Sequence, residues 1–330
     1  MGKDDYLYAA GVIRHLENKL LNPTDIKRMM DAPDLASAFK VFHDTDYFDN
    51  VLDVKPVEFI KALDADLVQA KRKIQEMAPS EELVEFLFMR YDFHNLKLLL
   101  KEKYSQSNLS GYLSPLGNES ADKLKALINN EKNIDVLRYL KRALAYIQEN
   151  LPKEASPQAI DRSSDQAFFI EYGQLAKKFG SQWISDLVRL QIDMANLKVF
   201  IRSKRLNYEK SELLFELVPG GNVQKDFFVK LLDMPEEEAL AGLRLHLPLN
   251  ARNLLDNYLK TKSLEELERD LENLELDYVR KVKFIDYGPE LIIAYYLAKK
   301  NAIRNVRLIM TGKLNNINAR EIEKRVREIY

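Results

Sequence analysis

Apolar residues recur at intervals of three and four along most of the chain, and the clearest example follows residue 262. Its apolar positions occupy one face of an α-helix: Leu264, Leu267, Leu271, Leu274 and Tyr278. Ser263 and Glu266 fit a capping box at the start of this helix. The chain shows no convincing run of alternating apolar and polar residues bounded by hairpin turns. The pattern therefore predicts an all-α fold.

Other helix ends are marked by capping residues. Ser80 precedes Glu81 and Glu82, an arrangement that caps a helix and places acids in its first turn. Proline in the sequence Gly288-Pro289-Glu290 predicts the start of a long helix near the C-terminus. Gly312 is predicted to close that helix.

One helical motif occurs twice. Residues 90–104 read RYDFHNLKLLLKEKY and residues 191–204 read QIDMANLKVFIRSK. The matched positions lie 101 residues apart: Asp92, Asn95 and Lys97 recur as Asp193, Asn196 and Lys198. A weaker third copy, AIRNVRLIMTGK, has Asn305 and Arg307 at the matching positions but Ala302 in place of the aspartate. The chain therefore contains three related helical units.

The segments after the first two copies also correspond. SPLGN at 114–118 matches VPGGN at 218–222, and a short amphipathic helix is predicted after each loop, from 122 and from 225. A repeat of about a hundred residues is longer than the units of common helical solenoids. We therefore predict a domain triplication. Its expected boundaries are 1–110, 111–215 and 216–330, with the N-terminal helix packing on the third domain.

Aspartate and asparagine three residues apart share one helix face, and two interpretations of this pair are open. The side chains could satisfy each other or nearby backbone where helices cross, because buried polar atoms require partners. They could instead bind a partner protein. The first interpretation is favoured for Asp92, Asn95, Asp193, Asn196 and Asn305.

Composition excludes several classes of function. The chain is 46% hydrophobic and 31% charged, with a formal net charge of −1, so no overall field attracts nucleic acid or an anionic membrane. It has no cysteine, which excludes disulfides and thiolate chemistry and favours a cytosolic protein. The acidic start MGKDDYLYAAG predicts no secretory signal. The longest apolar run, at 291–298, is far shorter than the roughly 20 residues that cross a bilayer.

No catalytic, cofactor or metal motif is found. No two of the four histidines lie three or four residues apart, so no helical metal pair is expected. The segment MTGKL at 310–314 fails as a phosphate loop because Arg307 occupies the position of the first glycine and Leu314 that of the serine or threonine. We therefore expect a monomeric helical interaction protein that binds no nucleotide and no cofactor.

Several stretches resemble one protein family over the whole chain. They are YLYAAGVIRHLENKLL followed by a proline loop, DLASAFKVFHDTDY, the recurring Asn-Leu-Lys helix, and RNVRLIMTGKLN. Together they resemble the C subunit of bacterial and archaeal V/A-type ATPases, whose counterpart in eukaryotic vacuolar ATPases is named d. The third copy departs from the pattern at Ala302, where the other two copies have aspartate.

The resemblance implies a non-catalytic role. Members of this family form a funnel of three helical domains with pseudo-threefold symmetry on the cytoplasmic face of the membrane proteolipid ring. The funnel receives the central stalk and couples ATP hydrolysis or synthesis to ion transport. The basic residues of the repeated helices would then help to seat the stalk: Lys97, Lys101, Lys198, Arg202, Arg304 and Arg307. The alternative is a free-standing α-helical scaffold or adaptor.

Overall fold

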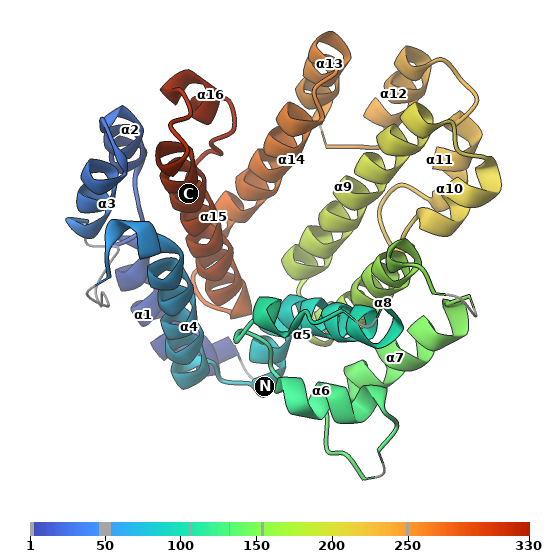
Figure 1. Cartoon of the computed structure of the whole chain (residues 1–330), viewed down its shortest axis with the longest axis horizontal. Coiled ribbons are helices and arrows are strands. Elements are labelled where there is room, and N and C mark those ends of the chain that lie inside the picture. Colours follow the sequence, from blue (N-terminus) through green and yellow to red (C-terminus); the bar gives the residue numbers. More distant parts are fainter. Residues whose placement is uncertain (1–2, 46–53, 106, 132, 153–154, 249–250) are drawn as a thin grey trace. The chain divides into compact units, whose positions relative to one another are not determined.

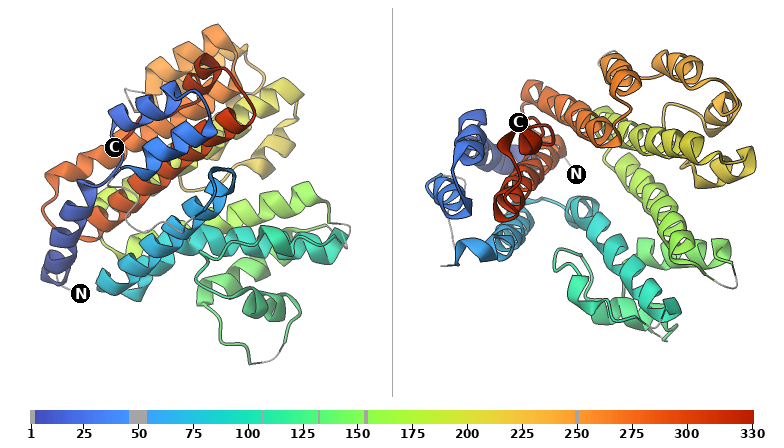
Figure 2. Two further views of the ribbon diagram at one scale, coloured as in Figure 1. Left: turned by 60° about the vertical axis from the view of Figure 1, so that its left-hand side comes forward. Right: turned by 45° about the horizontal axis from the view of Figure 1, so that its top comes forward.

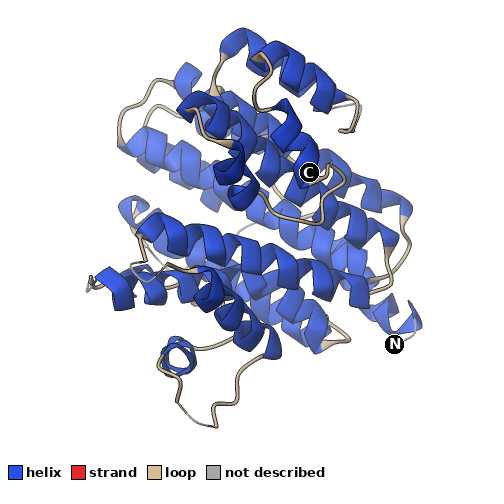
Figure 3. Cartoon of the chain, turned by 90° about the vertical axis from the view of Figure 1, so that its right-hand side faces the viewer, coloured by secondary structure: helices blue, strands red, loops and turns tan. Residues whose placement is uncertain are grey.

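The computed structural model describes residues 3–45, 54–105, 107–131, 133–152, 155–248 and 251–330. Within these segments the regular structure consists of sixteen α-helices and four short 3-10 helices, without a strand (Figure 3). The prediction of an all-α fold is confirmed. Residues 46 and 47, which end the motif DLASAFKVFHDTDY, lie outside the described segments.

Contacts between helices divide the chain into two units (Figure 1). The first unit, residues 1–79 and 248–330, contains α1 (Leu7–Glu17), α2 (Pro23–Asp31), α3 (Leu35–His43), α4 (Phe59–Met77), α13 (Ala251–Thr261), α14 (Leu264–Val279), α15 (Pro289–Leu314) and α16 (Ala319–Glu323). The second unit, residues 80–247, contains α5 (Glu81–Ser105), α6 (Ala121–Ile128), α7 (Arg138–Asn150), α8 (Pro157–Lys178), α9 (Gln182–Leu206), α10 (Lys210–Glu216), α11 (Lys225–Leu231) and α12 (Glu236–Arg244). The boundaries between the two units do not coincide with the predicted domain boundaries at 110 and 215. The three-domain organisation stays a prediction.

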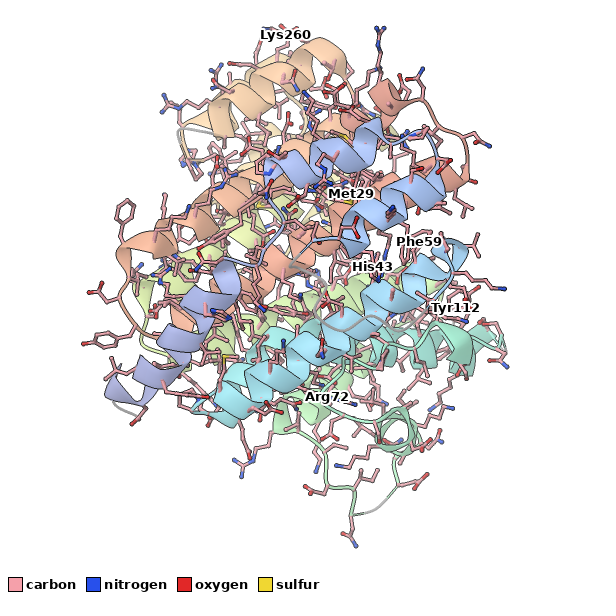
Figure 4. The ribbon with its side chains drawn as sticks, turned by 90° about the vertical axis from the view of Figure 1, so that its left-hand side faces the viewer. Met29, His43, Phe59, Arg72, Tyr112 and Lys260 are labelled. Carbon is pink, nitrogen blue, oxygen red and sulfur yellow. The ribbon has the colours of Figure 1, made fainter. Side chains whose placement is uncertain are left out.

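Helix α15 forms the centre of the first unit. It contacts α1, α2, α3, α4, α14 and α16, so the N-terminal helix α1 packs on the third copy of the repeated helix. Residues 291–298 of this helix are all apolar, as expected of a helix surrounded by others. Met29 on α2 and Phe59 at the start of α4, both labelled in Figure 4, are almost fully buried in the same unit.

Helix α8 is the central helix of the second unit and packs against α5, α7 and α9 (Figure 2). Aromatic side chains join α5 to α8. Phe86 stacks on Tyr172 with ring centroids 4.2 Å apart, and Phe93 meets Phe168 edge to face at 5.5 Å. Such pairs add to the stabilisation that comes from apolar burial.

The predicted helix starts are confirmed. The Ser80 hydroxyl accepts a hydrogen bond from the Leu83 backbone amide, and the Ser263 hydroxyl accepts one from that of Glu266. Pro289 is the first residue of α15. The short helices predicted after the two loops are α6 and α11.

The prediction that Gly312 closes α15 is wrong, because the helix continues to Leu314. A Cβ atom at Gly312 would lie 2.5 Å from Cδ1 of Ile322 on α16. The glycine therefore permits the close approach of α16 to α15. The neighbouring Lys313 donates hydrogen bonds to the carbonyl oxygens of Met30 and Ala32 at the end of α2.

Candidate functional site: three asparagine clamps and a basic helix face

The three repeated asparagines make the same contact. They lie on the three long helices: Asn95 on α5, Asn196 on α9 and Asn305 on α15. Each is at most 2% exposed. Each side-chain amide accepts a hydrogen bond from the backbone N–H of one downstream residue and donates one to the C=O of that residue. The downstream residues are Ser114, Val218 and Arg327.

The geometry of these bonds explains the choice of asparagine. The N–O distances are 2.7 and 2.9 Å for Asn95, 2.8 and 2.8 Å for Asn196, and 2.9 and 2.9 Å for Asn305. An amide side chain has one acceptor and one donor group side by side, which matches the donor and acceptor of a single residue's backbone. Aspartate could satisfy only the N–H. The clamp therefore holds an irregular downstream segment against the long helix.

In the first two copies the aspartate holds the rest of the same loop. Asp92 accepts hydrogen bonds from the Glu119 amide at 2.9 Å, the Asn118 side chain at 2.8 Å and the Tyr139 hydroxyl at 2.5 Å. Asp193 accepts bonds from the backbone amides of Asn222 and Val223 at 3.1 and 3.0 Å, and from the Asn222 side chain at 2.8 Å. The two loops are therefore fixed in the same way.

The loop glycines are required by this arrangement. A Cβ atom on Gly117 would lie 2.8 Å from Oδ1 of Asp92, and one on Gly221 would lie 2.2 Å from Oδ1 of Asp193. The backbone passes directly over each carboxylate, so no larger residue fits without movement. Ala302, the departure in the third copy, is buried and provides no carboxylate. The third copy therefore has the asparagine clamp without the aspartate contacts.

Burial shifts the pKa values of these acids. Desolvation raises the pKa of Asp92 from 3.8 to about 6, against the opposing effect of hydrogen bonds from Tyr139, Glu119 and Asn118. Desolvation likewise raises the pKa of Asp193. Burial beside Asp92 raises the pKa of Tyr139 well above its usual value, so this phenol stays protonated and donates to the carboxylate.

The six basic residues predicted as a partner interface do not share one environment. On α5, Lys97 lies 2.7 Å from Asp165 and Lys101 lies 2.7 Å from Asp161, both on α8. On α15, Arg307 pairs with Asp64 on α4 at 2.6 Å, and Arg304 pairs with Glu272 on α14. On α9, neither Lys198 nor Arg202 has an ion-pair partner among the described residues of the second unit. Four of the six therefore link helices within the chain.

The acids that pair with the repeated cations were missed by sequence reasoning, although a signal was present. Pro56 and Asp64 match Pro157 and Asp165, again at a separation of 101 residues. Asp64 pairs with the third-copy Arg307, and Asp165 pairs with the first-copy Lys97. The helix that precedes each of two long helices thus belongs to the repeat and provides its acid.

The second unit contains a cleft with a volume of about 680 Å³. Its charged lining includes Glu82, Glu85, Arg138 and Lys178, together with the Arg142–Glu171 ion pair. Burial raises the pKa of Glu85. No serine, threonine, cysteine or histidine is among its described lining residues. Within the described segments, no group of three acidic, histidine or cysteine side chains could hold a metal ion.

The site is thus a helix–loop clamp that recurs on three long helices. The family model for the ATP synthase (C/AC39) subunit matches residues 9–325. The chain belongs to this family.

Curated relatives match over nearly their whole length. The C subunit of the V-type sodium ATPase of Enterococcus hirae is 24% identical, with 97% of both chains covered. The C subunit of the A-type ATP synthase of Desulfurococcus sp. is 24% identical, covering 98% of this chain and 91% of the relative. That of Archaeoglobus fulgidus is 22% identical, covering 97% and 96%. The resemblance inferred from the repeated motifs is confirmed.

No helix in the described segments combines the length and the apolar character needed to cross a membrane. This holds for α15, whose apolar run at 291–298 is followed by Lys299, Lys300 and Arg304.

Proposed function

We propose that this chain is a non-catalytic central-stalk subunit of a V/A-type rotary ATPase. It links the rotating stalk to the membrane proteolipid ring and so couples ATP hydrolysis or synthesis to ion transport. The observation that supports this most directly is the family match over residues 9–325, joined to relatives that are named as the C subunit of such enzymes. On this proposal the chain lies at the cytoplasmic face of the membrane, attached through the ring.

The construction of the chain suits that role. A subunit that transmits torque must be stiff, and each clamp joins a long helix to its downstream segment through two hydrogen bonds. A triplicated adaptor can present similar surfaces to several members of a symmetric ring. We therefore propose that the three repeats surround a common axis as a funnel, with the stalk inside and the ring beneath.

Affinity purification with mass spectrometry tests the proposal. The full chain, tagged at either end and expressed in its own cells, should recover the catalytic head subunits, the stalk subunits and the proteolipid of a rotary ATPase. Recovery of all of these subunits together should persist in a mild detergent. When the ring is dissociated from the stalk, the chain should no longer recover the stalk subunits and the proteolipid together. If the chain is recovered without any ATPase subunit, the proposal is wrong and a free-standing scaffold is the better description.

A further inference from the structure

One segment of the first unit binds several helices without being helical itself. Residues 324–330, which we call the strap, follow α16 and contain neither helix nor strand. The third asparagine clamp fixes the middle of the strap, because Asn305 on α15 pairs with the Arg327 backbone. Asn301, one turn earlier on α15, donates a hydrogen bond to the carbonyl oxygen of Glu328 at 2.6 Å. The strap is therefore attached to the central helix of its unit through the backbone of two successive residues.

The strap also binds one face of α14. Four α14 side chains at helical spacing contact four successive or nearly successive strap residues, with N–O distances between 2.6 and 3.0 Å. The pairs are Arg269 with the Lys324 carbonyl oxygen, Glu265 with the Arg325 side chain, Glu272 with the Arg327 side chain, and Asn273 with the Glu328 backbone amide. The strap thus bridges α14 and α15.

The far end of the strap reaches two further elements. Glu328 pairs with Arg280 of the 3-10 helix η4 (Arg280–Phe284) at 2.6 Å. The Tyr330 hydroxyl donates a hydrogen bond to the Glu17 carboxylate on α1 at 3.0 Å. The same strap therefore joins α1, at one end of the sequence, to helices near the other.

These contacts are of a kind that can be released together. Of the seven strap residues only Ile329 is buried, at 8% exposure, and the other contacts are hydrogen bonds and partly exposed ion pairs. Exposed ion pairs contribute little singly, and salt weakens them. Segments with few buried apolar contacts are those that open locally while the rest of a protein stays folded.

We propose that the strap is a salt-sensitive lock that holds α14 and α1 on α15. With the strap attached, the first unit is rigid. When the strap detaches, α14 and the helix packed on it, α13, open together while α15 and the second unit stay folded. This inference concerns contacts within the first unit, so it does not depend on the proposed function.

Hydrogen exchange followed by mass spectrometry of the full chain tests the lock. Asn273→Ala with Tyr330→Phe removes the strap's bonds to α14 and α1 and leaves both bonds of Asn305 in place. Peptides from α13 and α14 should then exchange at least tenfold faster, and peptides from the middle of α15 and from α8 should be unchanged. Alanine favours a helix more than asparagine does, so faster exchange in α14 cannot come from weaker helix propensity.

The matched control makes the same two side-chain changes at exposed positions, Asn315→Ala with Tyr112→Phe. The control should exchange as the unchanged chain does throughout α13 and α14. The proposal is overturned if the strap variant matches the control, or if its α15 peptides accelerate as much as those of α14, since the whole unit would then be opening.

Salt provides a second measurement. Raising the salt from about 50 mM to about 1 M should speed exchange in α13 and α14 of the unchanged chain several-fold, relative to peptides from α8. Arg325→Gln with Arg327→Gln removes the two ion pairs with α14 but keeps the backbone that Asn305 binds. In this variant, exchange in α13 and α14 should be fast at low salt and respond little to added salt. An equal salt response in the variant and the unchanged chain overturns the proposal.

Discussion

Replacing Asn196 with alanine tests the central structural claim, that the repeated asparagine holds a downstream segment by pairing with its backbone. Asn196 and the Val218 backbone are both buried, and the two bonds between them are 2.8 Å long. Asn196→Ala removes both bonds and leaves a buried N–H and a buried C=O without partners. Each stranded group costs about 1–3 kcal/mol, so we expect a loss of about 2–6 kcal/mol for the two.

The first copy provides an internal comparison. The two bonds between Asn95 and the Ser114 backbone are only partly buried, so water can replace part of what Asn95→Ala removes. The expected loss is about 1–3 kcal/mol, smaller than for Asn196→Ala. A variant at an exposed asparagine, Asn315→Ala, serves as the control and should change stability by less than about 0.5 kcal/mol.

Urea denaturation followed by circular dichroism measures these differences, with the slope of the transition checked for each variant. Hydrogen exchange localises them, because the Val218 amide should lose its protection while amides in the middle of α15 keep theirs. The reasoning is refuted if Asn196→Ala leaves both the urea midpoint and the exchange rate of the Val218 amide unchanged. It is also refuted if that variant melts normally but no longer assembles, since the asparagine would then be a binding residue.

Three further predictions concern the loops, the buried acid and the ion pairs. Gly221→Ala should cost at least about 1–3 kcal/mol, because its Cβ would lie 2.2 Å from a carboxylate oxygen, whereas Gly111→Ala, with open space around it, should be nearly neutral in the same urea assay. Folding raises the pKa of Asp92 from 3.8 to about 6. Because the folded state binds this proton more tightly, protonation of Asp92 adds about 3 kcal/mol to the free energy of unfolding below pH 3.8. This contribution is lost as the pH rises to 6. The urea midpoint of Asp92→Asn should fall less steeply over this range than that of the unchanged chain, and parallel profiles would contradict the assigned shift. Asp66→Ala should cost about 3–5 kcal/mol because it removes the carboxylate that lies 2.9 Å from the buried Lys299 ammonium group. Asp64→Ala, on the same helix but exposed, should cost less than about 1 kcal/mol, and equal losses would be inconsistent with the difference in burial.

The sequence by itself determined the helices and the repeat. Apolar spacing of three and four residues is a local property, and so are the caps at Ser80 and Ser263, which satisfy N–H groups within three residues of themselves. The Asn-Leu-Lys motif and its weaker third copy, Asn-Val-Arg, placed Asn95, Asn196 and Asn305 at corresponding positions without any knowledge of their contacts. The family resemblance followed from the order of these same motifs.

Only the tertiary structure decided what the repeated polar groups contact. The backbone partners of the asparagines lie 19 or 22 residues downstream, across loops whose course no local pattern specifies. Gly312 illustrates the same limit, because glycine next to a cationic residue near a helix end is typical of a terminus, yet here it permits the approach of Ile322.

The basic residues show the difference most clearly. Spacing along the sequence places Lys97, Lys198 and Arg307 at equivalent positions on three helices. Spacing specifies the helix face on which a charge lies, but not which group of another helix it contacts. Acids of α8 and α4 lie within ion-pair distance of Lys97 and Arg307, whereas Lys198 has none among the described residues of its own unit. Helix periodicity is set by bonds between near neighbours, whereas the pairing of charges depends on which surfaces pack together, and that is a property of the folded chain.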